Sequence, residues 1–397
     1  MVTTQQATRI VLSRAVSFGE ETVSLQQAVG RILREDLVAD RDFPPFDRVS
    51  MDGIAIQYGR FANGQKTFKV EGLQAAGAPQ MTLADSGNCL EVMTGAVLPK
   101  GTDTVVRYED VLVKNDLATV QVANIKAGQN VHRRGMDRRQ GEVIVKKGSP
   151  LSPAEIGVAA TIGKPFLRVA RLPRVAIVST GDELVDITER PRAWQIRKSN
   201  VHNLAAAVSG WGIEARLFHL PDDKKNIRQV LSEVLDGYQA ILLSGGVSAG
   251  KLDFVPEVLE ELQVEKLFHK VSQRPGKPFW FGASEKAVVF AFPGNPVSSF
   301  MCLHRYFRPW LRAGQGLTPI EEKRAVLGTD FYFRPDLTYF LQVKIRWGEN
   351  GQLTATPIEG KGSGDLANLV DADAFMELPK GRNHFSKGES FRILFYR

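Results

Sequence analysis

The sequence predicts an α/β protein built from several domains, and three observations support that prediction. A chain of 397 residues is long enough for two or three domains with sizeable cores. Strands, loops and helices alternate over residues 172–314, which is typical of a parallel sheet covered by helices on both faces. Short β-type runs separated by turns lie both before and after that stretch. We therefore expect a three-layer α/β domain accompanied by two β-rich domains.

The composition is that of an ordinary globular protein with an excess of positive charge. Hydrophobic residues make up 43% and charged residues 24% of the chain, so extended disorder is not expected. No apolar run reaches membrane-spanning length and the first residues lack the form of a signal peptide, which favours a cytoplasmic protein without a membrane partner. The net charge of +7 suits either nucleic acid or a small polyanion. Because no RNA-binding signature or recognition-helix pattern accompanies this charge, we expect no nucleic-acid partner.

Helical segments open the chain and return after the first β-rich part. The run TTQQATRIVLSRAV has apolar residues at helical spacing, and Ser24 begins a capping-box pattern. Ser152 begins a second such pattern in SPAEIGVAATIG. We therefore predict a discontinuous helical linking domain over 1–45 and 132–171, interrupted by an inserted β-rich domain over 46–131.

The remaining chain divides into an α/β part and a second β part. Strands such as RVAIVST, YQAILLSG and KAVVFAF alternate with helices such as SNVHNLAAAVSG, in which Ser199 or Asn200 is the expected cap. A long helix is expected over VSSFMCLHRYFRPWLRAG. The boundaries predict an α/β domain over 172–314 and a C-terminal β domain, barrel or sandwich, over 315–397.

One loop of the α/β part nearly matches a P-loop. Gly245 to Lys251 reads Gly, four residues, Gly, Lys, but the next position is Leu252, where a P-loop has Ser or Thr as a metal ligand. The loop also follows the third strand of its domain rather than the first. Asp253 supplies a carboxylate from the loop itself. We therefore reject the P-loop interpretation.

The loops after the strands carry acidic residues, glycines and cations that a parallel sheet brings to one edge. They are STGDEL, LPDD, SGGVSAGKLD and FPGNPVS, and SQRPGKPF adds two cations. Glycines let the backbone approach phosphate, cations offset its charge, and carboxylates hold Mg²⁺. The residues expected there are Asp182, Glu183, Asp222, Asp223, Gly245, Gly246, Asp253, Arg274 and Lys277.

Each feature also has a structural explanation. Asp222 and Asp223 open a helix, and capping alone explains one of them. Asp253 is a candidate cap for the helix that begins at Phe254. Glycine pairs after strands are most often tight turns, and charge runs such as HRRGMDRR are usually solvated. His304 and Cys302 lie in a helix and favour packing over catalysis. The functional interpretation therefore rests on the features occurring together.

The motifs resemble those of the molybdopterin molybdenumtransferases, which include bacterial MoeA and the E domain of gephyrin. The resemblance covers essentially the whole chain. Its motifs, in order, are PPFDRVSMDGIAI, MTGAVLP, STGDEL, SNVHNLAAAVSGWG, SGGVSAGKLDF, RPGKPF, FPGNPVS and GSGDLANLVDADAFMELP.

The resemblance implies a fold and an activity. It implies that the α/β domain is of the molybdopterin-binding type. The expected reaction inserts molybdenum from molybdate into adenylylated molybdopterin, with Mg²⁺ as cofactor and release of AMP, in the last step of molybdenum cofactor synthesis. It also implies an elongated homodimer with each site shared between subunits, and an upstream adenylyltransferase is a possible partner.

The resemblance also assigns roles to residues. The implied catalytic residues are Asp52, Thr94, Glu183 and Asp253, and the implied metal ligands are Glu183, Asp222 and Asp253. The expected substrate-binding residues are Gly245, Gly246, Ser248, Arg274, Lys277, Pro293, Pro296, Arg133, Arg134 and Ser363. The chain departs from the family at Arg274, Lys198 and Leu337, where Lys, Asp and Arg are common.

Three other functions remain as alternatives. A molybdopterin adenylyltransferase resembles only 172–314, and the additional domains argue against it. A non-enzymatic molybdopterin-binding scaffold is disfavoured by the intact carboxylates. A general nucleotidase would hydrolyse plain ATP.

Overall fold

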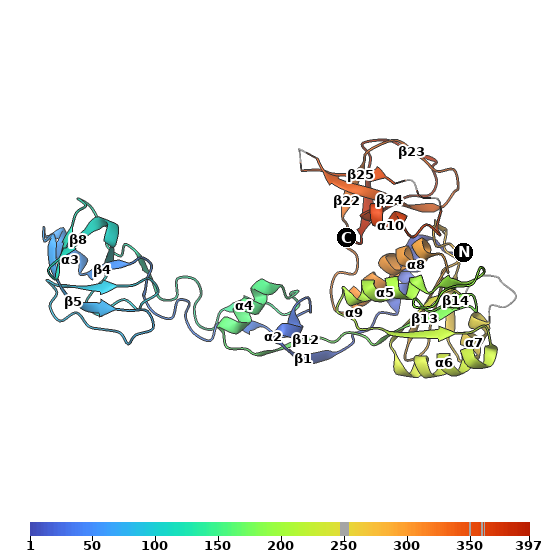
Figure 1. Ribbon diagram of the computed structural model, residues 1–397, viewed down its shortest axis with the longest axis horizontal. Coiled ribbons are helices and arrows are strands. Elements are labelled where there is room, and N and C mark those ends of the chain that lie inside the picture. Colours follow the sequence, from blue (N-terminus) through green and yellow to red (C-terminus); the bar gives the residue numbers. More distant parts are fainter. Residues whose placement is uncertain (247–253, 349–350, 359, 361) are drawn as a thin grey trace. The chain divides into compact units, whose positions relative to one another are not determined.

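The computed structural model describes residues 1–246, 254–348, 351–358, 360 and 362–397, which form two compact units (Figure 1). The N-terminal unit comprises 22–29 and 33–168, and the α/β unit comprises 1–21, 30–32 and 169–397. The chain passes from one unit to the other within β1 (Glu20–Ser24) and β12 (Phe166–Ala170), and again on either side of 30–32. The predicted division into four domains stays a prediction.

The N-terminal unit contains a curled sheet of six strands. Its strand order is β7-β4-β6-β5-β9-β8, and all pairs are antiparallel except β5 with β6. The hairpin between β8 and β9 turns at Asn115 and Asp116, whose φ angles of 52° and 57° are those of a tight left-handed hairpin turn. The strands are β4 (Gly53–Ile56), β5 (Thr67–Gln74), β6 (Cys89–Val92), β7 (Thr104–Arg107), β8 (Val111–Lys114) and β9 (Leu117–Val120).

Short helices and two-stranded ribbons complete this unit. The Ser152 hydroxyl accepts a hydrogen bond from the Ala154 amide at 3.1 Å, and the Ser152 amide donates to Glu155 at 2.7 Å. The predicted capping box is therefore confirmed. The helices are α2 (Leu25–Ala28), α3 (Tyr58–Ala62), the 3₁₀ turn η1 (Tyr108–Asp110) and α4 (Pro153–Thr161). The ribbons pair β2 (Leu37–Val38) with β11 (Val143–Val145) and β3 (Arg48–Val49) with β10 (Val131–His132).

A mixed sheet of six strands forms the centre of the α/β unit, with the order β16-β13-β17-β21-β20-β18. The first four strands are parallel, as predicted, but β20 and β18 are antiparallel to their neighbours. The short connection from Ala283 to Val288 is the reason, because a tight turn joins only antiparallel strands. The strands are β13 (Val175–Thr180), β16 (Arg216–Leu220), β17 (Ala240–Ser244), β18 (Glu265–His269), β20 (Trp280–Ala283) and β21 (Val288–Phe292).

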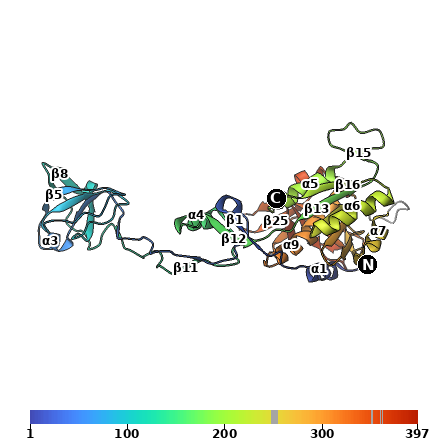
Figure 2. The ribbon, with the colours of Figure 1, turned by 90° about the horizontal axis from the view of Figure 1, so that it is seen from below.

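Helices cover both faces of this sheet, which confirms the three-layer prediction (Figures 1 and 2). Alternate residues of β17 pack on opposite sides: Leu242 joins the core with α5 and α8, whereas Leu243 joins the core with α6 and α7. The helices are α1 (Thr4–Ser13), α5 (Ser199–Ser209), α6 (Lys224–Gly237), α7 (Val255–Glu261), α8 (Pro296–Cys302) and α9 (Arg308–Gly314). No helix in the described ranges is both long enough and apolar enough to cross a bilayer.

The predicted long helix is interrupted by a π-helical turn. This turn, η2 (Leu303–Phe307), joins α8 to α9. Pro309, two residues after the turn, has no amide hydrogen, so a regular helix would leave the Arg305 carbonyl without its partner. The wider turn accommodates the proline without ending the helix.

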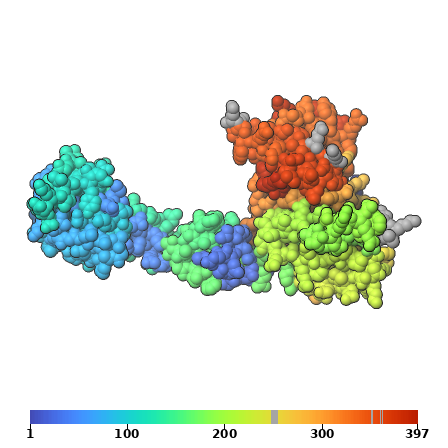
Figure 3. All heavy atoms as spheres, in the orientation of Figure 1, coloured from blue at the N-terminus to red at the C-terminus, as the bar shows by residue number. Residues whose placement is uncertain are grey.

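The C-terminal strands form a closed, barrel-like sheet. This part of the chain packs on the α/β layers, as the space-filling view shows (Figure 3). Closure comes from β26, which pairs with both β28 and β24. The barrel strands are β22 (Arg324–Leu327), β24 (Thr338–Trp347), β25 (Leu353–Pro357), β26 (Ala374–Leu378) and β28 (Ser390–Phe395). A short strand from earlier in the chain, β19 (Gln273–Arg274), pairs with β24. A ribbon of β23 (Phe331–Tyr332) with β27 (His384–Phe385) and a short helix α10 (Asn368–Asp371) complete it.

Candidate functional site

The loops that carry the predicted site residues of the α/β unit meet at one edge of its sheet. Ser179, Ser244 and Phe292 are in register at the carboxyl ends of three parallel strands. Trp280 pairs with Ala291, so the loop 270–279 lies at the same edge although its strands are antiparallel. We call this edge, with its loops, the rim.

Two glycines after β17 are required by their conformation and their surroundings. Gly245 and Gly246 have φ angles of 93° and 70°. A Cβ atom on them would lie 3.1 and 2.8 Å from the Thr180 hydroxyl oxygen. The Gly245 amide donates to the Phe292 carbonyl at 3.2 Å, so the sheet uses this amide and it is not available to phosphate. Ser248 and Asp253, predicted in the same loop, lie outside the described residues.

Carboxylates from two neighbouring loops lie close together at the rim. Asp182 accepts a hydrogen bond from the Asp222 amide at 3.1 Å, which ties the loop after β13 to the loop after β16. A Cβ atom on Gly181 would lie 2.3 Å from a Glu183 carboxylate oxygen, so Glu183 folds back over its own loop. Asp223 caps α6 by accepting from the Asn226 amide at 2.8 Å. Capping therefore explains Asp223 and leaves the Asp222 carboxylate for another role.

These carboxylates suit Mg²⁺ by their chemistry, since hard oxygen ligands are what Mg²⁺ prefers. Within the described ranges, however, no group of three or more Asp, Glu, His or Cys side chains is arranged to hold a metal ion. Of the three predicted metal ligands, Glu183 and Asp222 belong to the described residues, whereas Asp253 does not. The complete metal site stays a prediction.

His219 lies at the rim and was not predicted from the sequence. Its Nδ1 atom is 3.0 Å from the Ser179 hydroxyl. Burial lowers its pKa and the Lys198 charge lowers it further, against the opposing effect of Asp182 and Asp222. The sequence contained one indication of this position: His219 stands one residue before the end of a strand that leads into the Pro-Asp-Asp loop of the rim.

The PGNP loop joins the rim to the C-terminal barrel. Asn200 donates to the Ser244 hydroxyl at 2.9 Å and to the Gly294 carbonyl at 2.7 Å. The prediction that Ser199 or Asn200 caps α5 was wrong: Lys198 holds the cap position, and Asn200 bonds to the rim instead. Pro293 and Pro296 flank Gly294 and Asn295 in this loop.

Ser363, a predicted substrate-binding residue from the C-terminal segment, is brought to the rim. Its hydroxyl accepts a hydrogen bond from the side-chain amide of Asn295 at 2.8 Å. Its backbone carbonyl accepts a hydrogen bond from the backbone amide of Val297 at 3.1 Å. Arg274 and Lys277 are exposed in the loop 270–279. The Arg274 guanidinium lies 6.0 Å from the centre of the Phe333 ring, so it also rests on the barrel.

In the N-terminal unit the structure brings Asp52 and Thr94 together. One oxygen of Asp52 accepts from the Thr94 hydroxyl at 2.7 Å and from the Thr94 amide at 2.6 Å. The Thr94 hydroxyl, followed by its amide, lowers the pKa of the exposed Asp52 carboxyl. A Cβ atom on Gly53 would lie 2.0 Å from the Val106 carbonyl, so the position after Asp52 requires glycine.

The two arginines of the basic run are already paired with carboxylates. Arg133 contacts Asp47 at 2.7 Å, and the Arg134 guanidinium contacts Asp42 at 2.7 Å. The Arg134 amide also donates to Asp47 at 2.8 Å. These contacts give both side chains a structural role, and their predicted contact with substrate stays a prediction.

Three family models match successive parts of the chain. The model described as "MoeA N-terminal region (domain I and II)" matches residues 2–163. "Probable molybdopterin binding domain" matches 176–313, and "MoeA C-terminal region (domain IV)" matches 324–396. The order agrees with the resemblance read from the motifs.

Proteins similar over the whole chain carry the same family name. The molybdopterin molybdenumtransferase of Synechocystis sp. is 40% identical over 98% of this chain and 99% of its own length. That of Staphylococcus aureus strain Mu50 is 30% identical over 98% of this chain and 94% of its own. The crystal structure titled molybdopterin biosynthesis MoeA protein from Pyrococcus horikosii superposes with a TM-score of 0.82 at 29% identity, covering 100% of this chain and 99% of that one.

Proposed function

The chain belongs to the molybdopterin molybdenumtransferase (MoeA) family, and from this premise we propose the reaction that its rim performs. The protein is a transferase of molybdenum cofactor biosynthesis, and molybdate is its substrate. The acceptor in our proposal is adenylylated molybdopterin. Its phosphoanhydride is cleaved by water with release of AMP, and molybdenum is transferred to the molybdopterin.

The observation that carries the proposal is the group of carboxylates and cations at one rim. Asp182 and Asp222 are joined by a hydrogen bond, and Glu183 folds over the same loop. We assign Glu183, Asp222 and Asp253 to Mg²⁺, which when bound neutralises the diphosphate and polarises its anhydride. Arg274 and Lys277, exposed at the same edge, suit molybdate, a tetrahedral dianion.

Asp52 contributes a fixed negative charge rather than a base in this proposal. Thr94 lowers its pKa, which leaves the carboxylate ionised and a weak proton acceptor near neutral pH. The carboxylate would instead orient a cation or a water molecule. Following the family, we propose a homodimer in which Asp52 and Thr94 of one subunit complete the rim of the other.

AMP release tests the reaction. The purified protein, adenylylated molybdopterin and Mg²⁺ are mixed with and without molybdate, and AMP is quantified by chromatography. The proposal predicts AMP release that molybdate stimulates and that Glu183→Ala lowers about a hundredfold. Hydrolysis of plain ATP at a comparable rate, or release that ignores molybdate, would support a nucleotidase instead.

A further inference from the structure

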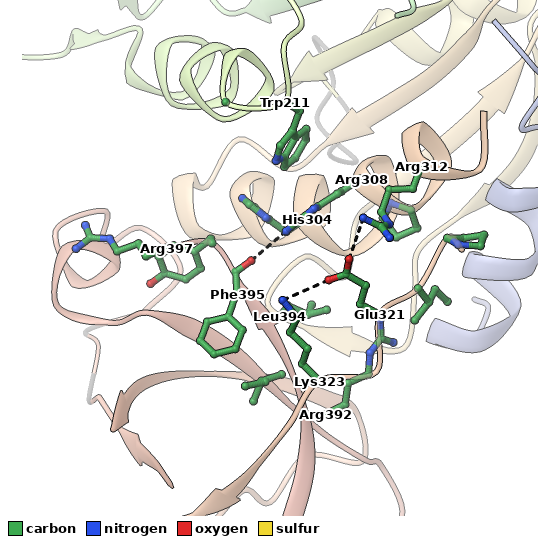
Figure 4. Close-up of a pocket in the computed structure, with 16 residues that line it drawn as sticks. Trp211, His304, Arg308, Arg312, Glu321, Lys323, Arg392, Leu394, Phe395 and Arg397 are labelled. Atoms are coloured by element: carbon green, nitrogen blue, oxygen red, sulfur yellow. Dashed lines mark hydrogen bonds and ion pairs between the residues drawn. The ribbon is translucent and has the colours of Figure 1, made fainter. Parts of the chain in front are cut away.

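A cavity that opens to solvent lies in the α/β unit, away from the rim. It has a volume of about 550 Å³ and is lined by the end of α5, by α9, by the segment 319–323 and by β28 (Figure 4). The two ends of α5 separate the two sites: Asn200 at its beginning bonds to the rim, whereas Trp211 after its end lines the cavity. Eleven helical residues span about 16 Å, so the cavity is a distinct site.

Positive charge dominates the lining. Among the described residues that line the cavity, five side chains are cations and one, Glu321, is a carboxylate. Glu321 is shared between Arg312 at 2.9 Å and Lys323 at 3.4 Å, so it neutralises only part of the charge. The cations are Arg308, Arg312, Lys323, Arg392 and Arg397.

Two of these arginines are held by backbone carbonyls and have further N–H groups. Arg308 donates to the Phe395 carbonyl at 3.4 Å, and Arg397 donates to the Val370 carbonyl at 2.8 Å. A guanidinium has five N–H donors, so each contact uses a fraction of the donors. Figure 4 shows Arg308 and Arg312 extending from α9, whereas the Arg397 guanidinium points away from them towards the outer side of the barrel.

A buried histidine without hydrogen-bond partners lies at the inner wall. His304 is 6% exposed, and neither ring nitrogen has a hydrogen-bond partner in the described part of the chain. Burial, with a smaller effect of the Arg308 charge, lowers its pKa to about 3, so the ring is neutral and offers one N–H and one lone pair. A buried polar group without a partner is costly, and an anion oxygen would satisfy its N–H.

We propose that this cavity binds a phosphate group, either as inorganic phosphate or pyrophosphate or as a small phosphate ester. The phosphate oxygens would accept hydrogen bonds from Arg308 and Arg312, with Lys323 and Arg397 adding charge and the His304 N–H contacting the buried side. Charge-assisted hydrogen bonds from several guanidinium groups are the usual means of holding phosphate. Neither the rim nor the proposed reaction uses these residues, so the site is additional to both.

Calorimetric titration of the full-length protein with sodium pyrophosphate, at low salt and with EDTA, tests the proposal. Lys323→Glu combined with Arg397→Glu reverses two exposed charges and should weaken binding about tenfold or more, because both residues line the cavity and their charges act on the ligand over a short distance. Lys387→Glu combined with Arg190→Glu, at exposed positions outside the cavity lining, gives the same change in net charge and should leave the affinity unchanged. Thermal melting confirms that each variant is folded.

Two further experiments distinguish binding in the cavity from binding at the rim and identify the ligand. In a background of Arg274→Glu with Lys277→Glu, which alters the rim, the pyrophosphate binding that depends on Lys323 and Arg397 should persist. A parallel titration with AMP identifies the ligand. If AMP binding also depends on Lys323 and Arg397, the site accepts phosphate esters. If pyrophosphate binds and AMP does not, the ligand is the inorganic ion. Each of three results would overturn the proposal. The wild type does not bind pyrophosphate, the wild type and the cavity variant bind it equally well, or the rim variant loses all binding.

Discussion

Asp52 and Thr94 show at the scale of single residues how the structure adds chemistry to a sequence motif. Asp52, in the motif SMDG, and Thr94, in the motif MTGA, are 42 positions apart in the sequence. Nothing in this spacing predicts that they are in contact. The family resemblance assigned both residues to the site, and the structure adds the two hydrogen bonds that join them. His219 shows the opposite case, because no motif pointed to it.

Removing the Thr94 hydroxyl should change the titration of Asp52. In Thr94→Val the pKa of Asp52 should rise towards the ordinary value of about 3.9, because the largest stabilising interaction of the carboxylate is lost. Since the folded-state pKa is the lower one, the stabilisation is present above the unfolded pKa and disappears as pH falls through the folded pKa. Carboxyl NMR titration measures this, and Thr94→Ser should keep the low pKa. An identical titration in Thr94→Val would show that the hydroxyl is irrelevant.

Gly246→Ala should destabilise the α/β unit through two separable effects. A positive φ costs any alanine about 1 kcal/mol, and the new Cβ would lie 2.8 Å from the Thr180 hydroxyl. Gly388→Ala, also at positive φ but with nothing within 4 Å, isolates the first effect. Urea unfolding should show a larger loss for Gly246→Ala, and equal losses would contradict the crowding argument.

Replacement of His304 should separate stability from anion binding. His304→Phe keeps a ring among Trp211 and Phe300 and removes two unpartnered nitrogens. In phosphate-free buffer the free energy of unfolding should rise by about 1 kcal/mol, while pyrophosphate affinity falls. A stable variant with unchanged affinity would exclude His304 from the cavity's function.

At the scale of elements, local signals predicted the helices better than the sheet edges. The Ser152 capping box and the buried runs of β13, β17 and β21 could be read directly. The strands β18 and β20 could not, because EKLFH and WFGA are short and their direction depends on a distant partner. The π turn before Pro309 was missed for a related reason, since helical periodicity continues through it.

Ser152→Ala tests the element-scale account. Loss of the cap should lower the stability of the N-terminal unit by about 1 kcal/mol. Amide exchange in α4 should accelerate first, because its initial amides lose their acceptor. Ser152→Thr should behave like the wild type, and unchanged exchange in Ser152→Ala would show that packing alone holds the helix.

At the scale of the whole molecule, the sequence motifs indicated the family and the rim, but not the cavity beside α9. Strand order and register explain the rim, because parallel strands place their loops together. The cavity combines α5, α9, the segment 319–323 and β28, which no local pattern connects. Only the packing of the barrel on the α/β layers brings these cations together.

Mixing two inactive variants tests most directly the claim that the rim of one subunit works with Asp52 and Thr94 of another. Asp52→Ala and Glu183→Ala are purified separately, each with activity reduced about a hundredfold, and their subunits are exchanged. Random exchange makes half of the dimers mixed, and each mixed dimer regains one intact site, so molybdate-dependent AMP release should recover to about a quarter of the wild-type rate. Recovery near that value is the predicted result. Verified mixed dimers that release no more AMP than the separate variants would contradict the shared site.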